Sequence, residues 1–221
     1  MRDLYNRQLR QLNGELIHMG EMIEKAISSA VSALVERDDQ KAREIIAFDD
    51  EIDQQERLIE SMCMKLLLAQ QPVAGDLRMV SSALKVITDM ERIGDHAADI
   101  SEIELMLDQL PPMTNESLRR MATETSVMLM RSIESFAERD QGKALWVIEH
   151  DDVVDGLFVT VKRELIEAIR ERPENGECAA DLLMAAKYFE RIGDHATNIA
   201  EWAIYAITGE HARGTDEGDP S

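Results

Sequence analysis

Aromatic residues, proline and cysteine are all scarce in this sequence. Its 221 residues include 4 Phe, 3 Tyr and 2 Trp, together 4%, and only 5 Pro. A core with so few aromatic rings but 13 Met is typical of helices that pack through Leu, Ile, Ala and Met. Cys63 and Cys178 form no Cys-x-x-Cys pattern, which argues against a disulfide framework or a thiolate zinc site. We expect both thiols to be reduced and without a functional role.

Positive charge and long apolar runs are also scarce. The chain has 24 Lys+Arg against 44 Asp+Glu, a formal net charge of −20, which would repel a nucleic-acid backbone. Nucleic acid is therefore not an expected partner, whereas cations and basic proteins suit this charge. The sequence shows neither the apolar core of a signal peptide at its start nor the roughly 18 consecutive apolar residues of a membrane-spanning helix. We expect a cytoplasmic protein.

An internal repeat is the main feature that the sequence does contain. The stretch ERIGDHA occurs at residues 91–97 and again at 190–196, an offset of 99. Upstream, ERDDQKAREIIAFDDEID at 36–53 matches ERDQGKALWVIEHDDVVD at 138–155, an offset of 102. The three-residue difference falls between loop-forming segments rich in Pro, Gly and Asn. The chain is therefore expected to consist of two related halves of about a hundred residues each.

Both halves are expected to be entirely helical. Apolar residues recur every three or four positions between Leu182 and Ala203, and no stretch alternates as a strand would. Turn-forming residues interrupt the pattern five times, leaving six long helices, three in each half. The sequence predicts an all-α fold of two tandem three-helix bundles. The predicted boundaries are 1–110 for the first bundle, 111–209 for the second and 210–221 for a flexible tail.

Four pairs of acidic residues occupy equivalent places in the two halves. Each pair has the spacing E/D-x-x-x-D, which puts both carboxylates on one face of a helix. They are Asp49 with Asp53, Glu91 with Asp95, Asp151 with Asp155, and Glu190 with Asp194. If the second and third helices of each half pack antiparallel, four carboxylates would meet. Ligands that are all oxygen suit hard cations such as Mg²⁺, Mn²⁺, Ca²⁺ or iron.

The alternative for these carboxylates is a solvated surface neutralised by basic side chains. Arg92 and Arg191 are the nearest competitors in the sequence, and a single such pair would mean little in so charged a chain. His96 and His195 follow the aspartates by one residue and point about 100° away, so we do not expect them to bind the ion directly. Gly94 and Gly193 lie inside helices, where glycine is unfavourable, and are expected to allow close approach of a neighbouring helix.

These motifs resemble the PhoU family of phosphate-transport regulators. The resemblance rests on DDEID, QQPVAGDLRMV, ERIGDHAADI, DDVVD and ERIGDHATNIAEW, and it covers nearly the whole chain. It implies two three-helix bundles and a homodimeric cytoplasmic regulator, peripheral to the inner face of the membrane through its partners. It also implies bound divalent or trivalent metal ions, with iron, manganese, magnesium and zinc as candidates. Each site would hold one ion or a cluster of several.

The resemblance assigns the metal clusters to the eight carboxylates already named. Lesser candidates are Asp50, Asp152, Asp99 and its neutral counterpart Asn198. Because Asp99 is charged and Asn198 is not, and because Glu56 corresponds to Phe158, we expect the first site to bind divalent cations more tightly.

The family resemblance implies a negative regulator of phosphate uptake and of the phosphate-starvation response. Its implied partners are the nucleotide-binding subunit of a phosphate ABC transporter and a sensor histidine kinase. A carboxylate-bridged metalloenzyme and a metal-free helical scaffold are the alternatives. Di-iron enzymes of helical bundles use Glu-x-x-His, whereas Gly94 and Gly193 follow the glutamates at that spacing, and the chain has no phosphate-binding glycine loop. We therefore expect no enzymatic activity.

Overall fold

Six long helices make up the structure, a computed structural model that describes residues 2–70, 74–107 and 116–211. The helices are α1 (Arg2–Glu36), α2 (Asp39–Gln70), α3 (Ala74–Met106), α4 (Glu116–Glu138), α5 (Gln141–Glu171) and α6 (Gly176–Thr208), with a short 3₁₀ turn at Pro173–Asn175. The described ranges contain no strand. The all-α prediction of six helices is confirmed. Both the border predicted at residue 110 and most of the predicted tail lie outside the described residues.

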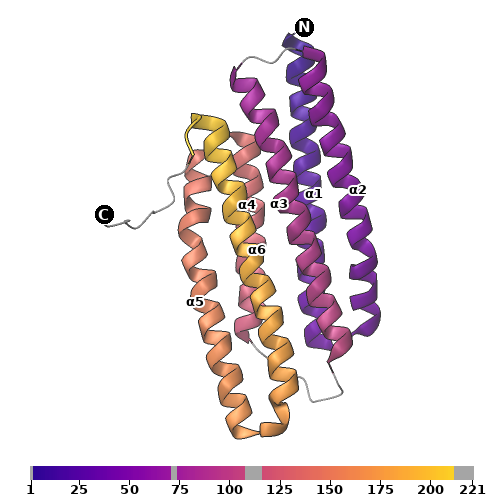
Figure 1. Ribbon diagram of the computed structural model, residues 1–221, viewed down its shortest axis with the longest axis vertical. Helices are drawn as coiled ribbons and strands as arrows, with labels where there is room; N and C mark the ends of the chain where they lie inside the picture. Colours follow the sequence, from indigo (N-terminus) through magenta and orange to yellow (C-terminus); the bar gives the residue numbers. More distant parts are fainter. Residues whose placement is uncertain (1, 71–73, 108–115, 212–221) are drawn as a thin grey trace, which may run out of the picture.

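The helices form two antiparallel three-helix bundles that lie side by side (Figure 1). Helices α1, α2 and α3 make the first bundle, and α4, α5 and α6 make the second. The bundles meet through α3 against α6 and α1 against α4, whereas α2 and α5 contact, among the described helices, only those of their own bundle. Helices α2 and α5 are thus the outermost helices, at opposite edges of the molecule.

Packing of small residues brings the two bundles close together. Gly20 on α1 is buried, and a β-carbon at this position would lie 2.5 Å from Cδ1 of Ile133 on α4. Glycine at position 20 therefore allows Ile133 to pack directly against the α1 backbone. No helix in the described ranges is long and apolar enough to cross a membrane.

The first turn of each bundle is built in the same way. Arg37 and Arg139 adopt left-handed backbone conformations, each with φ of 58°, one residue after the end of a helix. The next amide, of Asp38 or Asp140, donates to a carbonyl in the last turn of the preceding helix, at 3.1 and 2.9 Å respectively. This pattern is the Schellman motif. The same aspartates then cap the following helices, accepting from the amides of Lys41 and Lys143.

Replacing Asp140 by alanine is expected to lower the free energy of unfolding by about 1 kcal/mol, because α5 would lose the side-chain acceptor for its first-turn amide. Urea denaturation followed by circular dichroism measures the change. Asp140→Asn keeps the acceptor and serves as the control. Equal stability of the alanine and asparagine variants would show that the cap does not contribute.

Candidate metal centre

The structure brings the first two acidic pairs together where α2 packs against α3. Burial, followed by the charges of Asp95, Asp53 and Glu91 in that order, raises the pKa of Asp49 to about 6. The pKa of Glu91 is also raised, first by burial and then by the charge of Asp95. Four carboxylates from two helices therefore interact electrostatically. The sequence predicted this meeting only on the condition that the two helices pack against each other.

Gly94 makes this approach possible. A β-carbon at Gly94 would lie 3.1 Å from Cγ2 of Ile52 and 3.3 Å from Oδ1 of Asp49. At the equivalent Gly193, a β-carbon would lie 3.1 Å from Oδ1 of Asp151. Any larger residue would push the aspartate away from its neighbours. The prediction that these glycines allow close helix approach is confirmed, and the closest polar atom at each is a predicted ligand.

Asp49 also has an unsatisfied oxygen. Its Oδ1 atom is buried and accepts no hydrogen bond from any residue that the structure describes. A buried carboxylate oxygen without a donor is costly, because it has lost the hydration it would have in water. Such an oxygen is stabilised by either a proton or a cation. The residues of the α2–α3 contact therefore fit a bound metal ion.

Basic side chains compete for the outer carboxylates of this cluster. Arg57 lies 2.7 Å from Asp53, and Arg92 contacts Asp95 at 3.1 Å and Glu91 at 3.5 Å. Over the described residues, no three or more His, Cys, Asp or Glu side chains are already arranged as a ligand set for a metal. An ion bound here would require the carboxylates to turn away from these arginines. The competition expected from Arg92 is thus observed, and Arg57 adds to it.

The second bundle holds a related cluster where α5 packs against α6, but Glu190, unlike its counterpart Glu91, is not among the charges that act on the central aspartate. Burial, followed by the charges of Asp194, Asp155 and Asp152, raises the pKa of Asp151 to about 6. Lys187 forms an ion pair with Glu190. Arg191, the competitor expected from the sequence, instead lies over the ring of Tyr188.

The lesser candidates have different surroundings in the structure. Asp50 and Asp152 are exposed, but their charges act on Asp49 and Asp151. Asp99 lies 3.2 Å from Nδ1 of His96 instead.

Asn198 also lies away from the acidic clusters. Its amide donates to Asp89 on α3. Asp99 and Asn198 thus have hydrogen-bonding partners of their own at the α3–α6 contact. Glu56, in contrast, does act on the first cluster, because its charge raises the pKa of Glu91.

A third polar cluster, missed in the sequence, joins the two bundles at this contact. The rings of His96 and His195 lie 5.6 Å apart. His195 Nδ1 is 2.8 Å from Asp89, and His96 lies 5.3 Å from Tyr188. Since Tyr188 corresponds to Asp89 at the offset of 99, these two contacts are related by an approximate twofold axis between the histidines. The repeated motif thus packs against its own copy, and only the packing of the bundles reveals this.

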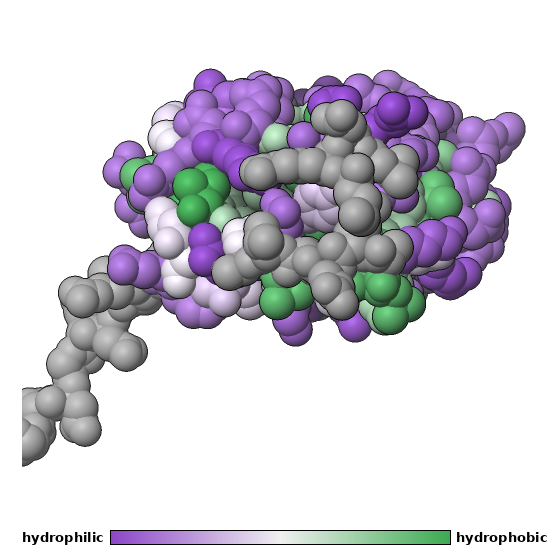
Figure 2. All heavy atoms as spheres, turned by 90° about the horizontal axis from the view of Figure 1, so that it is seen from above, coloured by the Kyte–Doolittle hydropathy of each residue, from purple (hydrophilic) through white to green (hydrophobic). Residues whose placement is uncertain are grey.

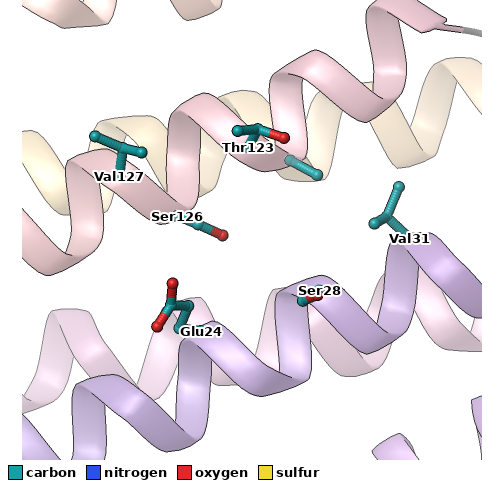
Figure 3. A pocket seen from close by; sticks show the side chains of 7 residues that line it. Glu24, Ser28, Val31, Thr123, Ser126 and Val127 are labelled. Carbon is teal, nitrogen blue, oxygen red and sulfur yellow. The ribbon is translucent and has the colours of Figure 1, made fainter.

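Helices α1 and α4 form the other contact between the two bundles. There a pocket of about 230 Å³ is lined by Glu24, Ser28, Val31, Ala122, Thr123, Ser126 and Val127 (Figure 3). Glu24 and Ser126, which are equivalent at the offset of 102, point towards each other across it. The pocket offers one carboxylate and three hydroxyl groups, a weaker ligand set than either acidic cluster.

Fold and site together define a class: duplicated three-helix-bundle proteins with an acidic cluster between the second and third helix of each repeat. The model of the PhoU domain matches residues 16–103 and 118–203, one match in each bundle. The chain belongs to the PhoU family. The two matches also agree with the duplication inferred from the repeated motifs.

Individual relatives agree over almost the full length. A phosphate-specific transport system accessory protein PhoU homolog of Pseudomonas aeruginosa is 35% identical over 95% of this chain and 87% of that protein. One from Aquifex aeolicus is 38% identical over 92% of this chain and 93% of that protein.

Two solved structures are similar as well. The crystal structure of PhoU from Pseudomonas aeruginosa has a TM-score of 0.86 at 34% identity, covering 93% of this chain and 100% of that one. The phosphate transport system regulatory protein PhoU from Streptococcus pneumoniae also has a TM-score of 0.86, at 28% identity, covering 95% of this chain and 99% of that one. These relatives are named as accessory or regulatory proteins, which confirms the prediction that the chain is not an enzyme.

Proposed function

We propose that this protein is a metal-binding regulatory adaptor of a phosphate transport system, a negative regulator of phosphate uptake and of the phosphate-starvation response. Its targets would be the nucleotide-binding subunit of the phosphate ABC transporter and a sensor histidine kinase. The observation that carries this proposal is the match to relatives named as accessory proteins of phosphate-specific transport, over more than nine-tenths of the chain. We further propose a cytoplasmic homodimer that reaches the inner face of the membrane through these partners.

The metal-binding part of the proposal is supported by the buried, unsatisfied oxygen of Asp49 and by its carboxylate neighbours. Asp49, Asp53, Glu91 and Asp95 would hold one ion or cluster, and Asp151, Asp155, Glu190 and Asp194 the other. A bound cation would neutralise like charges on facing helices and so fix the packing of α2 on α3 and of α5 on α6. The ion would therefore have a structural role, presenting a defined surface to the partners.

A metal-free scaffold is the second candidate, and the ion pairs of Arg57 and Arg92 favour it. In that case the arginines, rather than a cation, would neutralise the first cluster. Metal analysis of protein purified without added metal salts distinguishes the two candidates. Bound metal supports the adaptor with metal clusters, and metal-free protein with unchanged regulation supports the scaffold.

Deletion of the gene is expected to derepress phosphate-responsive genes when phosphate is abundant, since a negative regulator would be lost. Reporter expression in the deletion strain, with and without a plasmid copy, measures this. Crosslinking in cells is also expected to join the chain to the transporter's nucleotide-binding subunit or the sensor kinase. Unchanged expression in the deletion strain would contradict the regulatory function, and loss of the crosslink on removing residues 210–221 would contradict binding through the bundles.

A further inference from the structure

Charge is distributed very unevenly along the first bundle. Tyr5 donates a hydrogen bond to the carbonyl of Asp76, and Gln8 lines a pocket with Met62 and Lys65, so the start of α1, the end of α2 and the start of α3 form one end of the bundle. Residues 5–14, 61–70 and 75–88 contain five Arg or Lys and one Asp, whereas residues 15–60 and 89–107 contain 19 Asp or Glu and six Arg or Lys. We call this end the basic tip.

Among the residues that the structure describes, the basic side chains of the tip have no acidic partners. In the described part of the chain, no ion pair involves the tip residues Arg7, Arg10, Lys65, Arg78 or Lys85. In the acidic remainder of the bundle, five of the six basic residues are paired: Arg37, Lys41, Arg43, Arg57 and Arg92. Arg7, Arg10, Lys65 and Lys85 are exposed as well. Their charges are therefore free to interact with an anionic partner.

Large apolar side chains are exposed among these cations. Leu68 is 80% exposed, Leu77 47% and Met64 45%. Figure 2, which views the molecule onto this end, shows apolar patches scattered among hydrophilic residues. Figure 1 shows the end protruding beyond the second bundle. A protruding end with exposed leucines between unpaired cations has the chemistry of an interfacial membrane anchor.

The equivalent end of the second bundle differs in charge rather than in apolar content. Glu167 corresponds to Lys65 at the offset of 102, and Glu177 corresponds to Arg78 at the offset of 99. Ile166 and Met184 are nevertheless 43% and 50% exposed near that end. The corresponding residues 163–172 and 174–187 contain four Arg or Lys and six Asp or Glu. The two ends thus share exposed aliphatic side chains, but only the residues of the basic tip carry a net positive charge.

The net charge of −20 does not prevent such a contact. Leu68 and Asp53 are separated by fifteen residues of α2, which corresponds to about 22 Å at 1.5 Å per residue. The Debye length is about 8 Å at physiological ionic strength, so the acidic clusters are screened from a surface that touches the tip. If the molecule lay flat, the same clusters would be brought against that surface. Repulsion between the acidic clusters and an anionic surface therefore favours an orientation in which only the basic tip touches that surface.

We propose that the basic tip binds directly to membranes that contain anionic lipids, with the cations on the headgroups and Leu68, Leu77 and Met64 at the acyl boundary. This contact would place the long axis of the first bundle upright on the bilayer, with both acidic clusters held away from it. Direct lipid binding goes beyond the proposed function, which reaches the membrane through protein partners, and does not depend on metal binding.

Cosedimentation of the full chain with vesicles tests the proposal. The protein is expected to bind vesicles of phosphatidylglycerol and phosphatidylcholine in equal parts, to bind less as salt rises, and not to bind phosphatidylcholine alone. Arg7→Glu combined with Lys65→Glu is expected to weaken binding at least about tenfold, from roughly 1 kcal/mol for each basic residue near an anionic surface. Leu68→Ser is expected to weaken binding several-fold at low and high salt alike.

The matched control reverses two arginines at the opposite end of the molecule. Arg163→Glu combined with Arg170→Glu changes the net charge by the same amount, and both residues are exposed on α5. This variant is expected to bind vesicles as the wild type does. Circular dichroism and urea denaturation check that every variant is folded.

Three results would overturn lipid binding at the tip. They are no binding to anionic vesicles at low salt, equal binding to phosphatidylcholine vesicles, and equal losses in the tip and control variants. If the tip variant kept full vesicle binding but lost its crosslink to the transporter, the tip would be a protein-binding surface and the lipid proposal would be wrong. The proposed regulatory function would stand in each of these cases.

Discussion

Replacing both Asp49 and Asp53 by asparagine is expected to abolish divalent-cation binding at the α2–α3 contact and to leave the α5–α6 cluster loaded. The first cluster would keep Glu91 and Asp95, which Arg92 already neutralises in part. The two remaining carboxylates would carry half of the cluster's negative charge, and ligand charge sets the affinity for a hard cation. Metal content after equilibrium dialysis against Mn²⁺, measured by plasma mass spectrometry, should fall by half. Replacing all eight carboxylates should remove the rest.

A matched control uses an acidic pair of the same spacing elsewhere in the fold. Glu134 and Glu138 on α4 are also four residues apart, and both contact Lys143. Glu134→Gln combined with Glu138→Gln removes the same number of charges and should leave the metal content unchanged. Equal metal content in the wild type and in the variant that lacks all eight carboxylates would defeat the proposed metal centre.

The second large effect concerns Glu104, a nearly fully buried carboxyl group at the end of α3. Its nearest cation is Arg37, 3.6 Å away in the α1–α2 turn. Arg37 also donates to Cys178 on α6, so this residue links the two bundles. Burial raises the pKa of Glu104 from 4.5 to about 7, although the positive charge of Arg37 lowers it. The effect of burial on the pKa of Glu104 is therefore larger than the opposite effect of the ion pair with Arg37.

This pKa predicts how stability depends on pH. The folded protein holds the Glu104 proton up to about pH 7 and the unfolded chain only up to about pH 4.5, so the stabilisation by protonated Glu104 is lost as pH rises through this range. The loss amounts to at most about 3 kcal/mol. Glu104→Gln, which mimics the protonated acid, should remove this dependence and be more stable than the wild type at pH 8 by about 2 to 3 kcal/mol.

Urea denaturation at pH 5 and pH 8 measures the effect. Glu102→Gln, two residues away on an exposed position of α3, is the control and should change stability little at either pH. If Glu104→Gln destabilised the protein at pH 8, the ion pair with Arg37 would outweigh desolvation and the sign of the prediction would be wrong.

Local chemistry explains why most of the fold could be read from the sequence. Asp38 and Asp140 cap helices, and Arg37 and Arg139 end them, through bonds within a few residues of the chain. Such signals depend only on the local chain, and they marked the turn between the first two helices of each half. The duplication could also be recognised from the sequence, because both copies keep the acidic pairs at the same spacing and the same glycine.

The surroundings of side chains that meet between helices could not be read in this way. Asp95 and Asp99 are four residues apart on α3, yet Asp95 acts on Asp49 of α2 while Asp99 contacts His96. Their spacing suggested a shared environment, but two different helices pack against adjoining sides of α3. A sequence pattern gives the angle of a side chain around its own helix, and it does not give the identity of the helix opposite.

The sequence by itself determined the six helices, their turns, the two halves and the eight carboxylates, because each follows from the period of one helix or from comparison of the two repeats. Tertiary structure alone decided which groups those residues meet. It placed the unsatisfied oxygen of Asp49 beside Gly94, set His96 against His195, and gathered the unpaired cations of α1, α2 and α3 at one tip. These contacts join residues far apart in the chain, and their energies depend on burial and distance, which only the packed helices define.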